Sequence, residues 1–333
     1  MNSSVKLKET APWIVLILIF SLVPVLNTSD YQLTLANHML VWGLFAVSFN
    51  MLFGQTGMLS FGQALYYGLG AYFTGMLVDR IGPEWFLPGM GMGIIAAGLL
   101  ALAIGPLTIR VTGVYFTVLT LAFAQLAWGI TFKWYEFTGG DDGIQGILPP
   151  GILNDPVVYY YFTLALVLAS IWFLRRIAHS PFGLTLRCIR QNPERVRFLG
   201  RRVRRNQLGI YIISGVFAAL AGGLVAGVDN SIHTDMFFWT TSGEVILMSV
   251  LGGIGQFFGP FLGAGLIILI EDVVGAYTEY WSFIIGAIML VMVILFPMGV
   301  LGEIQKLRAR MKGRHAKREI TGEGELGTDP RTR

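Results

Sequence analysis

Long apolar runs separated by short polar segments occupy most of the chain, and ten of them are candidate membrane spans. A transmembrane helix needs roughly 20 predominantly apolar residues, because it must cross the hydrocarbon core of the bilayer. The candidate spans are 11–26, 31–53, 63–79, 87–109, 113–133, 157–174, 208–228, 243–256, 259–276 and 281–299. Helices satisfy their own backbone polar groups in lipid. The pattern therefore predicts an all-α polytopic membrane protein with about ten transmembrane helices.

Two polar or glycine-rich segments interrupt this pattern within the membrane zone. They are residues 54–63, with the sequence GQTGMLSFGQ, and residues 252–260, with the sequence GGIGQFFGP. Non-helical backbone survives at membrane depth where it is buried in protein or lines a wet cavity. Short, glycine-interrupted segments in the two halves of a membrane protein point to a transport path. Close helix packing through small residues is the alternative, and the two explanations are compatible. We predict two broken, re-entrant-like segments.

Basic residues concentrate between the sixth and seventh candidate spans. Residues 175–205 hold ten arginines and one glutamate. Loops rich in lysine and arginine remain cytoplasmic, so we expect a cytoplasmic loop at 175–207 and, by parity, both termini on the same side. The opposite loops carry mainly acids: Glu136, Asp141, Asp142, Asp155, Asp229 and Asp235. The predicted organisation is a cytoplasmic N-terminus (1–10), a permease domain (11–300) and a charged cytoplasmic tail (301–333) that is partly disordered.

Composition supports the membrane class and excludes several kinds of chemistry. Hydrophobic residues make up 54% of the 333 residues and charged residues 13%, with a net charge of +4. Because the positive charge serves orientation, we expect no nucleic-acid partner. Cys188 is the only cysteine, which excludes an internal disulfide and a thiolate metal cage. The sequence contains no phosphate-binding loop, no zinc-protease motif and no nucleophile-elbow motif. We predict no enzymatic activity, no cofactor and no metal.

Carboxylates inside the apolar spans are few and lie near span ends, as Glu244, Glu271 and Asp272 do. Ion-coupled carriers place ionisable groups at mid-membrane, where they pair or relay protons. A membrane protein that lacks both an ion-coupling cluster and a nucleotide site must draw energy from elsewhere. The sequence thus favours a translocation subunit driven by a separate motor. A self-sufficient ion-coupled carrier and a receptor without flux are the alternatives.

Five ordered blocks carry a family resemblance: 50–72, 112–126, 137–147, 180–200 and 250–267. Together they resemble the inner-membrane permeases of branched-chain amino acid ABC importers, of the LivM type, with the urea permeases of the same superfamily as the nearest rival. The resemblance implies transport of leucine, isoleucine and valine across the bacterial inner membrane. Urea, short amides and aromatic acids are the alternative substrates. The implied partners are a second related permease chain, two cytoplasmic ABC ATPases, a periplasmic solute-binding protein and membrane lipid.

In that family, the segment matching 180–205 is a cytoplasmic coupling region that docks into a groove on the ATPase. The residues carried over are Pro181, Phe182, Gly183, Leu184, Arg187, Cys188, Arg190, Asn192, Pro193 and Glu194. We expect Leu184, Cys188 and Ile189 to form an apolar face that enters the groove, with Arg187 and Arg190 paired to acids at its rim. The alternative is that the arginines only set topology and contact anionic lipid headgroups.

Polar side chains within the spans are the candidate walls of the substrate path. Burying an amide without a partner costs roughly 2–7 kcal/mol, so these groups should face protein or water. The candidates are Asn50, Gln55, Ser60, Gln63, Tyr115, Thr117, Thr120 and Gln125. Interhelical hydrogen bonds that hold the bundle together are the alternative for each of them.

The segment Thr138–Gly143 is expected in an external loop. Its glycines and acids lack the further oxygens and distal glutamate of an EF-hand, so we predict no calcium site. Contact with the solute-binding protein and a plain surface turn are the two interpretations.

Overall fold

The computed structural model describes residues 29–277 continuously, together with 20–22, 24, 283, 284, 286, 287, 290, 299 and 302. The predicted spans 11–26 and 281–299 lie largely outside the described residues, and so do the N-terminal segment 1–10 and most of the tail 301–333.

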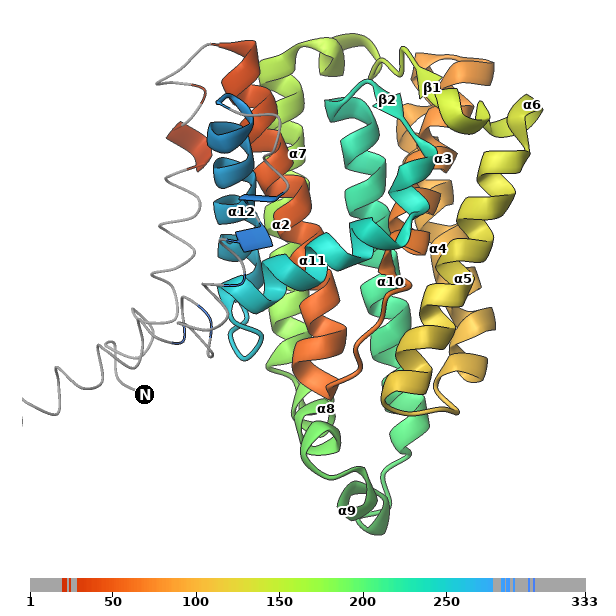
Figure 1. Cartoon of the computed structure of the whole chain (residues 1–333), viewed down its shortest axis with the longest axis vertical. Coiled ribbons are helices and arrows are strands. Elements are labelled where there is room, and N and C mark those ends of the chain that lie inside the picture. The colour runs from red at the N-terminus through yellow and green to blue at the C-terminus, as the bar shows by residue number, and fades with distance from the viewer. Residues whose placement is uncertain are drawn as a thin grey trace, which may run out of the picture.

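The described part of the chain is a bundle of helices, which agrees with the predicted all-α class (Figure 1). Its longer helices are α2 (Asp30–Thr56), α3 (Gln63–Ile81), α4 (Phe86–Thr108), α5 (Val114–Lys133), α7 (Pro156–Ala178), α10 (Val203–Val228), α11 (Trp239–Gly252) and α12 (Gly259–Gly275). The shorter helices are η1 (Pro83–Trp85), α6 (Tyr135–Thr138), η2 (Gly140–Asp142), η3 (Gly151–Asn154), α8 (Pro181–Gln191), α9 (Pro193–Phe198) and η4 (Thr234–Phe237). The short strands β1 (Ile144–Gln145) and β2 (Ser231–Ile232) pair antiparallel, with Ile144 opposite Ile232.

Five helical segments among the described residues are long and apolar enough to cross a membrane. They are Asp30–Thr56, Pro83–Thr108, Val114–Lys133, Pro156–Ala178 and Val203–Val228. The helices α3, α11 and α12, with 19, 14 and 17 residues, fall outside this set. These findings establish a multi-pass membrane protein and leave the total of ten helices as a prediction.

Most predicted spans agree with the observed helices to within a few residues, and the largest differences fall beside the arginine-rich loop and at the span before the second interrupted region. The prediction 243–256 is wrong at both ends, because α11 runs from Trp239 to Gly252. Gly253 has φ of 109° and ends the helix, so the residues after it belong to a non-helical segment. The helix α7 continues to Ala178 and α10 begins at Val203, so Arg175, Arg176, Arg204 and Arg205 lie in helix ends.

The helix α2 forms the centre of the bundle and packs against α7, α10, α11 and α12. Of its most apolar window, 78% is buried inside the protein. The Phe45 ring of α2 stacks on the Tyr67 ring of α3, with centroids 4.6 Å apart. A helix that is apolar on all sides is expected in such a position.

Small residues allow α3 and α10 to approach closely. A Cβ atom added at Gly70 would lie 1.8 Å from the Ala219 carbonyl oxygen, and one added at Gly222 would lie 1.8 Å from the Tyr67 carbonyl oxygen. A larger side chain at either position would force the helices apart. Close packing through small residues therefore explains these two glycines.

The bundle has two distinct ends (Figure 1). The helices α8 and α9 form the elbow, which lies at one end, and α6, β1 and β2 lie at the other. We call these the elbow end and the hairpin end. The arginine-rich loop and the loop Thr138–Gly143 thus lie at opposite ends of the bundle, and the sides of the membrane that they face stay a prediction.

Candidate transport site and coupling surface

Side-chain caps followed by proline start both helices of the elbow. The Ser180 hydroxyl accepts a hydrogen bond from the Gly183 amide at 3.3 Å, and Pro181 follows as the first helical residue. The Asn192 side-chain oxygen accepts one from the Arg195 amide at 3.0 Å, and Pro193 follows in the same way. Serine or asparagine at the cap with proline next is a strong local helix start. Two short helices, Pro181–Gln191 and Pro193–Phe198, therefore occupy most of the arginine-rich loop.

The helix α8 is amphipathic, and its inner face is held against the bundle. Leu186 and Ile189 are buried, with 0% and 3% exposure. At Gly183 an added Cβ would lie 2.3 Å from the Ala178 carbonyl oxygen, so only glycine lets α8 fold back so closely on the end of α7. The expectation that Ile189 belongs to the outward apolar face is wrong, because its helical position points it inward.

The outward face of α8 carries Leu184, which is 59% exposed, and the exposed thiol of Cys188. These two residues are one helical turn apart, so they share a face. Beyond α8, Phe198 and Leu199 at the end of α9 are 90% and 80% exposed. The sequence interpretation missed this second apolar pair, although adjacent large apolar residues within an arginine-rich segment are a visible signal.

Arg187 and Arg190 donate hydrogen bonds to the ends of neighbouring helices. An Arg187 Nη2 donates to the Ala178 carbonyl at the end of α7 at 3.1 Å, and Arg190 Nη1 donates to the Gly54 carbonyl near the end of α2 at 2.6 Å. Carbonyls in a last helical turn lack partners within the helix and attract cations. Both guanidinium groups thus have partners within the chain that the sequence interpretation did not identify, and their pairing with acids at a partner's rim stays a prediction. Each retains further N–H donors for a partner.

The first break spans residues 57–62, slightly shorter than predicted. Gly57 ends α2 with φ of 76°, a left-handed conformation that glycine adopts without strain, and its amide donates to the Phe53 carbonyl at 2.8 Å. In Figure 1 the connection from α2 to α3 runs from the elbow end back into the bundle. Its backbone groups therefore need partners away from water.

Hydroxyl groups from distant helices supply several of those partners. The Thr117 hydroxyl donates to the Leu59 carbonyl at 2.9 Å, and the Thr120 hydroxyl accepts from the Phe61 amide at 3.2 Å. Ser242 of α11 accepts from the Ala64 amide at 2.9 Å. These contacts join the first break to α5, and the start of α3 to α11. The sequence interpretation missed Ser242, whose only signal is a hydroxyl within an apolar run.

The second break, residues 253–258, contacts the end of α2. The Asn50 amide nitrogen donates to the Gln256 carbonyl at 3.2 Å. An added Cβ at Gly54 would lie 2.8 Å from the Ile254 carbonyl oxygen. The end of α2 thus contacts the second break on one side and Arg190 of the elbow on another.

The structure gathers six of the predicted path residues around the first break and the end of α2. They are Asn50, Gln55, Ser60, Gln63, Thr117 and Thr120, of which Ser60, Gln63 and Thr120 are 0% exposed. The buried Gln63 Nε2, Gln55 Oε1 and Asn50 Oδ1 atoms have no hydrogen-bond partner among the described residues. Unpartnered amide atoms at this depth mark a place where a polar group or water is energetically favoured.

Tyr115 and Gln125 do not belong to this group. Tyr115 is 78% exposed, because the buried face of α5 carries Phe116 and Thr120 and the position before Phe116 points outward. Gln125 lines an outer cavity with Leu126 and Lys133.

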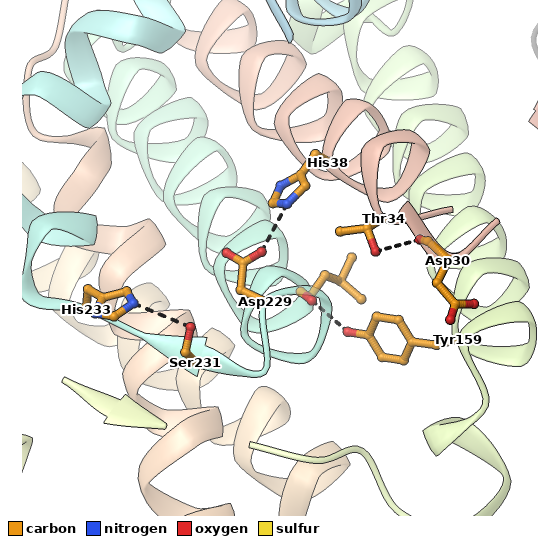
Figure 2. Close-up of polar contacts among 8 residues, drawn as sticks. Asp30, Thr34, His38, Tyr159, Asp229, Ser231 and His233 are labelled. Atoms are coloured by element: carbon orange, nitrogen blue, oxygen red, sulfur yellow. Dashed lines mark hydrogen bonds and ion pairs between the residues drawn. The ribbon is translucent and has the colours of Figure 1, made fainter. Parts of the chain in front are cut away.

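Several polar side chains at the hairpin end contact one another or the backbone (Figure 2). The His38 Nε2 atom lies 3.0 Å from Asp229 Oδ1, and the buried Tyr159 hydroxyl donates to the Leu224 carbonyl at 2.6 Å. Tyr135 donates to Asp142 at 2.7 Å, and this hydrogen bond raises the pKa of the Tyr135 hydroxyl. Within the described ranges, no group of three histidine, cysteine, aspartate or glutamate side chains is arranged to hold a metal ion.

Comparisons with known proteins place the chain in a family. The family model described as the permease component of branched-chain amino acid transport systems matches residues 31–293, which include both breaks and the elbow. The chain is 28% identical over 291 residues to the high-affinity branched-chain amino acid transport system permease protein LivM of Escherichia coli K12, covering 79% of this chain and 68% of that one.

More distant relatives include LivH of the same strain, which is 24% identical over 292 residues covering 80% of this chain and 93% of LivH. The galactose/methyl galactoside import permease protein MglC of Salmonella typhimurium is 28% identical over 219 residues, covering 58% and 64%. No solved structure matches the chain. The match across both breaks and the elbow shows that this chain belongs to the family of permease components of branched-chain amino acid transport systems.

Proposed function

We propose that the chain is the membrane-spanning subunit of an ATP-driven importer that carries leucine, isoleucine and valine across the bacterial inner membrane. The family and the relatives named LivM support the substrate class. The proposal that a separate ATPase supplies the energy rests on the elbow. Its capped helices present exposed apolar side chains and several arginines. Such a surface suits docking into a groove on a separate ATPase.

The elbow end is the cytoplasmic end in this proposal. The arginines of residues 175–205 favour that side, and the acids of the opposite loops favour the periplasm. A solute-binding protein would then deliver the amino acid at the hairpin end, where Thr138–Gly143 is a candidate contact.

A second, related permease chain completes the path. Escherichia coli K12 contains both LivM and LivH, which are permease proteins of its high-affinity branched-chain amino acid transport system, and this chain resembles each. A heterodimer with two ATPases is therefore the assembly we propose. The outward face of α5, including Tyr115, is available for contact with the second permease or with lipid.

In this proposal, movement of the elbow is transmitted to the substrate path through α2. Arg190 holds the Gly54 carbonyl, and the end of α2 contacts the second break through Asn50 and Gly54. A displacement of α8 by the ATPase would thus shift the first and second breaks together. Rocking of helices around a fixed site is the general mode of alternating access.

The substitution Leu184→Glu tests the docking surface. Leu184 is 59% exposed, whereas Arg187 and Arg190 cap helices of their own chain. We expect the variant to insert normally, to lose the ATP-hydrolysing partner on copurification and to lose ATP-driven leucine uptake. A carboxylate in an apolar groove costs several kcal/mol, on the order of a hundredfold or more in affinity.

Ile152→Glu is the matched control, because Ile152 is 80% exposed at the hairpin end. It should retain the ATPase partner. Copurification of the ATPase with the Leu184→Glu variant at the unmodified level would overturn the docking assignment. Titration of the binding protein with leucine, valine and galactose would test the substrate class separately.

A further inference from the structure

A cavity of about 500 Å³ lies in the hairpin half of the bundle, between α2, α3, α10, η4 and α11. This volume is within the range of small-molecule sites. Most of its lining is aromatic or acidic: Trp42, Tyr67, Phe238, Asp229, Asp235 and Glu244. The cavity is separate from the breaks and from the elbow.

One wall of the cavity is a fixed aromatic surface. The Trp42 and Tyr67 rings have centroids 5.7 Å apart, and the Tyr67 ring is stacked from behind by Phe45 at 4.6 Å. Rings held in this way offer a rigid apolar surface that loses little entropy when a ligand binds. An aliphatic side chain fits such a wall.

The rest of the lining carries more acidic than basic side chains. Asp229 is paired with His38 at 3.0 Å, as Figure 2 shows. Asp235 and Glu244 form no ion pair with any described residue. His233, also in the lining, lies with its Nε2 atom 3.4 Å from the Ser231 hydroxyl. Two unpaired carboxylates beside an apolar wall favour a cationic group on a ligand.

A buried hydroxyl and a helix start also border this space, and at the helix start the Thr241 amide donates to the Phe238 carbonyl at 3.2 Å. Tyr67 is 2% exposed, and its hydroxyl forms no hydrogen bond with any described residue although it borders the cavity. The helix α11, with 14 residues, begins at Trp239 with no side-chain cap, and its first-turn residues Thr240 and Thr241 line the cavity. Uncapped amides at a helix start attract a carboxylate.

We propose that this cavity binds the amino-acid zwitterion on its way from the binding protein to the breaks. The α-ammonium lies against Asp235 and Glu244, and the carboxylate faces the start of α11. The aliphatic side chain packs on Trp42 and Tyr67. This inference rests on the proposed function, since it assigns a subsite to the same transport reaction.

The placement fits delivery from the hairpin end. The strand β2 leads directly to His233, and β1, which follows the loop Thr138–Gly143, pairs with β2. An added Cβ at Gly143 would lie 3.0 Å from His233 Nδ1. A binding protein seated on that loop would thus be adjacent to the cavity.

A single cysteine in the cavity tests the proposal. Cys188→Ser removes the only native cysteine, and Thr240→Cys adds one at an exposed position in the lining. Spheroplasts carrying the full-length chain with its transporter partners are treated with a membrane-impermeant maleimide. Leucine at about ten times its Kd should slow alkylation about tenfold, because only the unoccupied cavity reacts.

The same measurement is repeated with 4-methylpentanoate in place of leucine. This compound keeps the carbon skeleton of leucine and lacks the ammonium group. It should leave the alkylation rate unchanged, and adding Glu244→Gln should cancel protection by leucine, measured in each background as the ratio of the rates without and with leucine. The control is Ile152→Cys in the same background, which should react at a rate that leucine does not alter. Equal protection by both compounds, or none by leucine, would overturn the proposal.

Uptake of radiolabelled leucine by the unmodified chain in the same cells separates the two claims. Import without protection of the cavity cysteine overturns the subsite and leaves the proposed function standing. Protection without ATP-driven import of any branched-chain amino acid overturns the proposed function and leaves the cavity as a binding site.

Discussion

The elbow and the first break are both departures from long helices, and they are held in different ways. In the elbow, the caps join residues three positions apart, as Ser180 to Gly183 and Asn192 to Arg195. In the first break, the Phe61 amide and the Leu59 carbonyl bond to hydroxyls of α5, beside a local contact between the Gly62 amide and Ser60. Just after the break, the contact between Ala64 of α3 and Ser242 spans 178 residues.

The difference favours two mechanical roles, one for a segment that moves as a rigid unit and one for a segment that changes shape. A segment whose hydrogen bonds are local keeps its shape while it moves as a unit. A segment held by hydroxyls from α5, and followed by a helix start held from α11, changes shape when those helices shift, because its partners move away. This contrast suits an elbow that transmits force and a break that opens, consistent with two-state elements in transporters.

The largest effect is expected for Gly183→Leu. The new side chain would collide with the Ala178 carbonyl, since even a Cβ would lie 2.3 Å from it, so α8 must leave the end of α7. Overpacking of this kind costs about 1–3 kcal/mol or more. We expect uptake to fall by more than about tenfold while the chain still inserts, because a displaced elbow misplaces the whole docking surface.

Gly265→Leu is the control, since no heavy atom lies within 4 Å of a Cβ added there. The measurement is leucine uptake normalised to the amount of chain in the membrane. Uptake by the Gly183→Leu variant equal to that of the control would show that α8 need not pack on α7.

A smaller effect is expected for Thr120→Val in the first break. The Phe61 amide would lose its acceptor in a buried place, which costs about 1–3 kcal/mol. Thr120→Ser retains the hydroxyl and should stay close to the unmodified chain. Thermal unfolding in detergent and uptake are both measured. Equal stability of the valine and serine variants would show that water or another group replaces the hydroxyl.

The smallest effect is expected for Ser180→Ala at the start of α8. Loss of a cap costs about 1 kcal/mol, and Pro181 still favours the helix start. Thr185→Ala is the matched control, because its hydroxyl donates to a helical carbonyl and caps nothing. Hydrogen exchange of the α8 amides should accelerate in the Ser180→Ala variant alone. Acceleration spread over the whole bundle would contradict the local character of the elbow.

The same contrast explains how much the sequence predicts. The caps of the elbow are visible as Ser180-Pro181 and Asn192-Pro193, and the spans follow from apolar runs. The partner of Arg190 lies 136 residues away, so only the folded chain reveals it. Tyr115 points outward and Ile189 points inward. Successive residues of a helix are rotated by about 100° about its axis, and apolar composition alone does not determine which residue faces the bundle. The charged cavity also gathers residues from five elements.

The native thiol of Cys188, exposed on the outward face of α8, tests the central claim that a separate ATPase drives the chain through the elbow. Its alkylation rate is measured in the chain alone and in the assembled importer that hydrolyses ATP. The account predicts rapid alkylation in the chain alone and strong protection in the assembly, lost again when the ATPase is removed. An ATP-hydrolysing assembly in which Cys188 reacts as fast as in the isolated chain would contradict it.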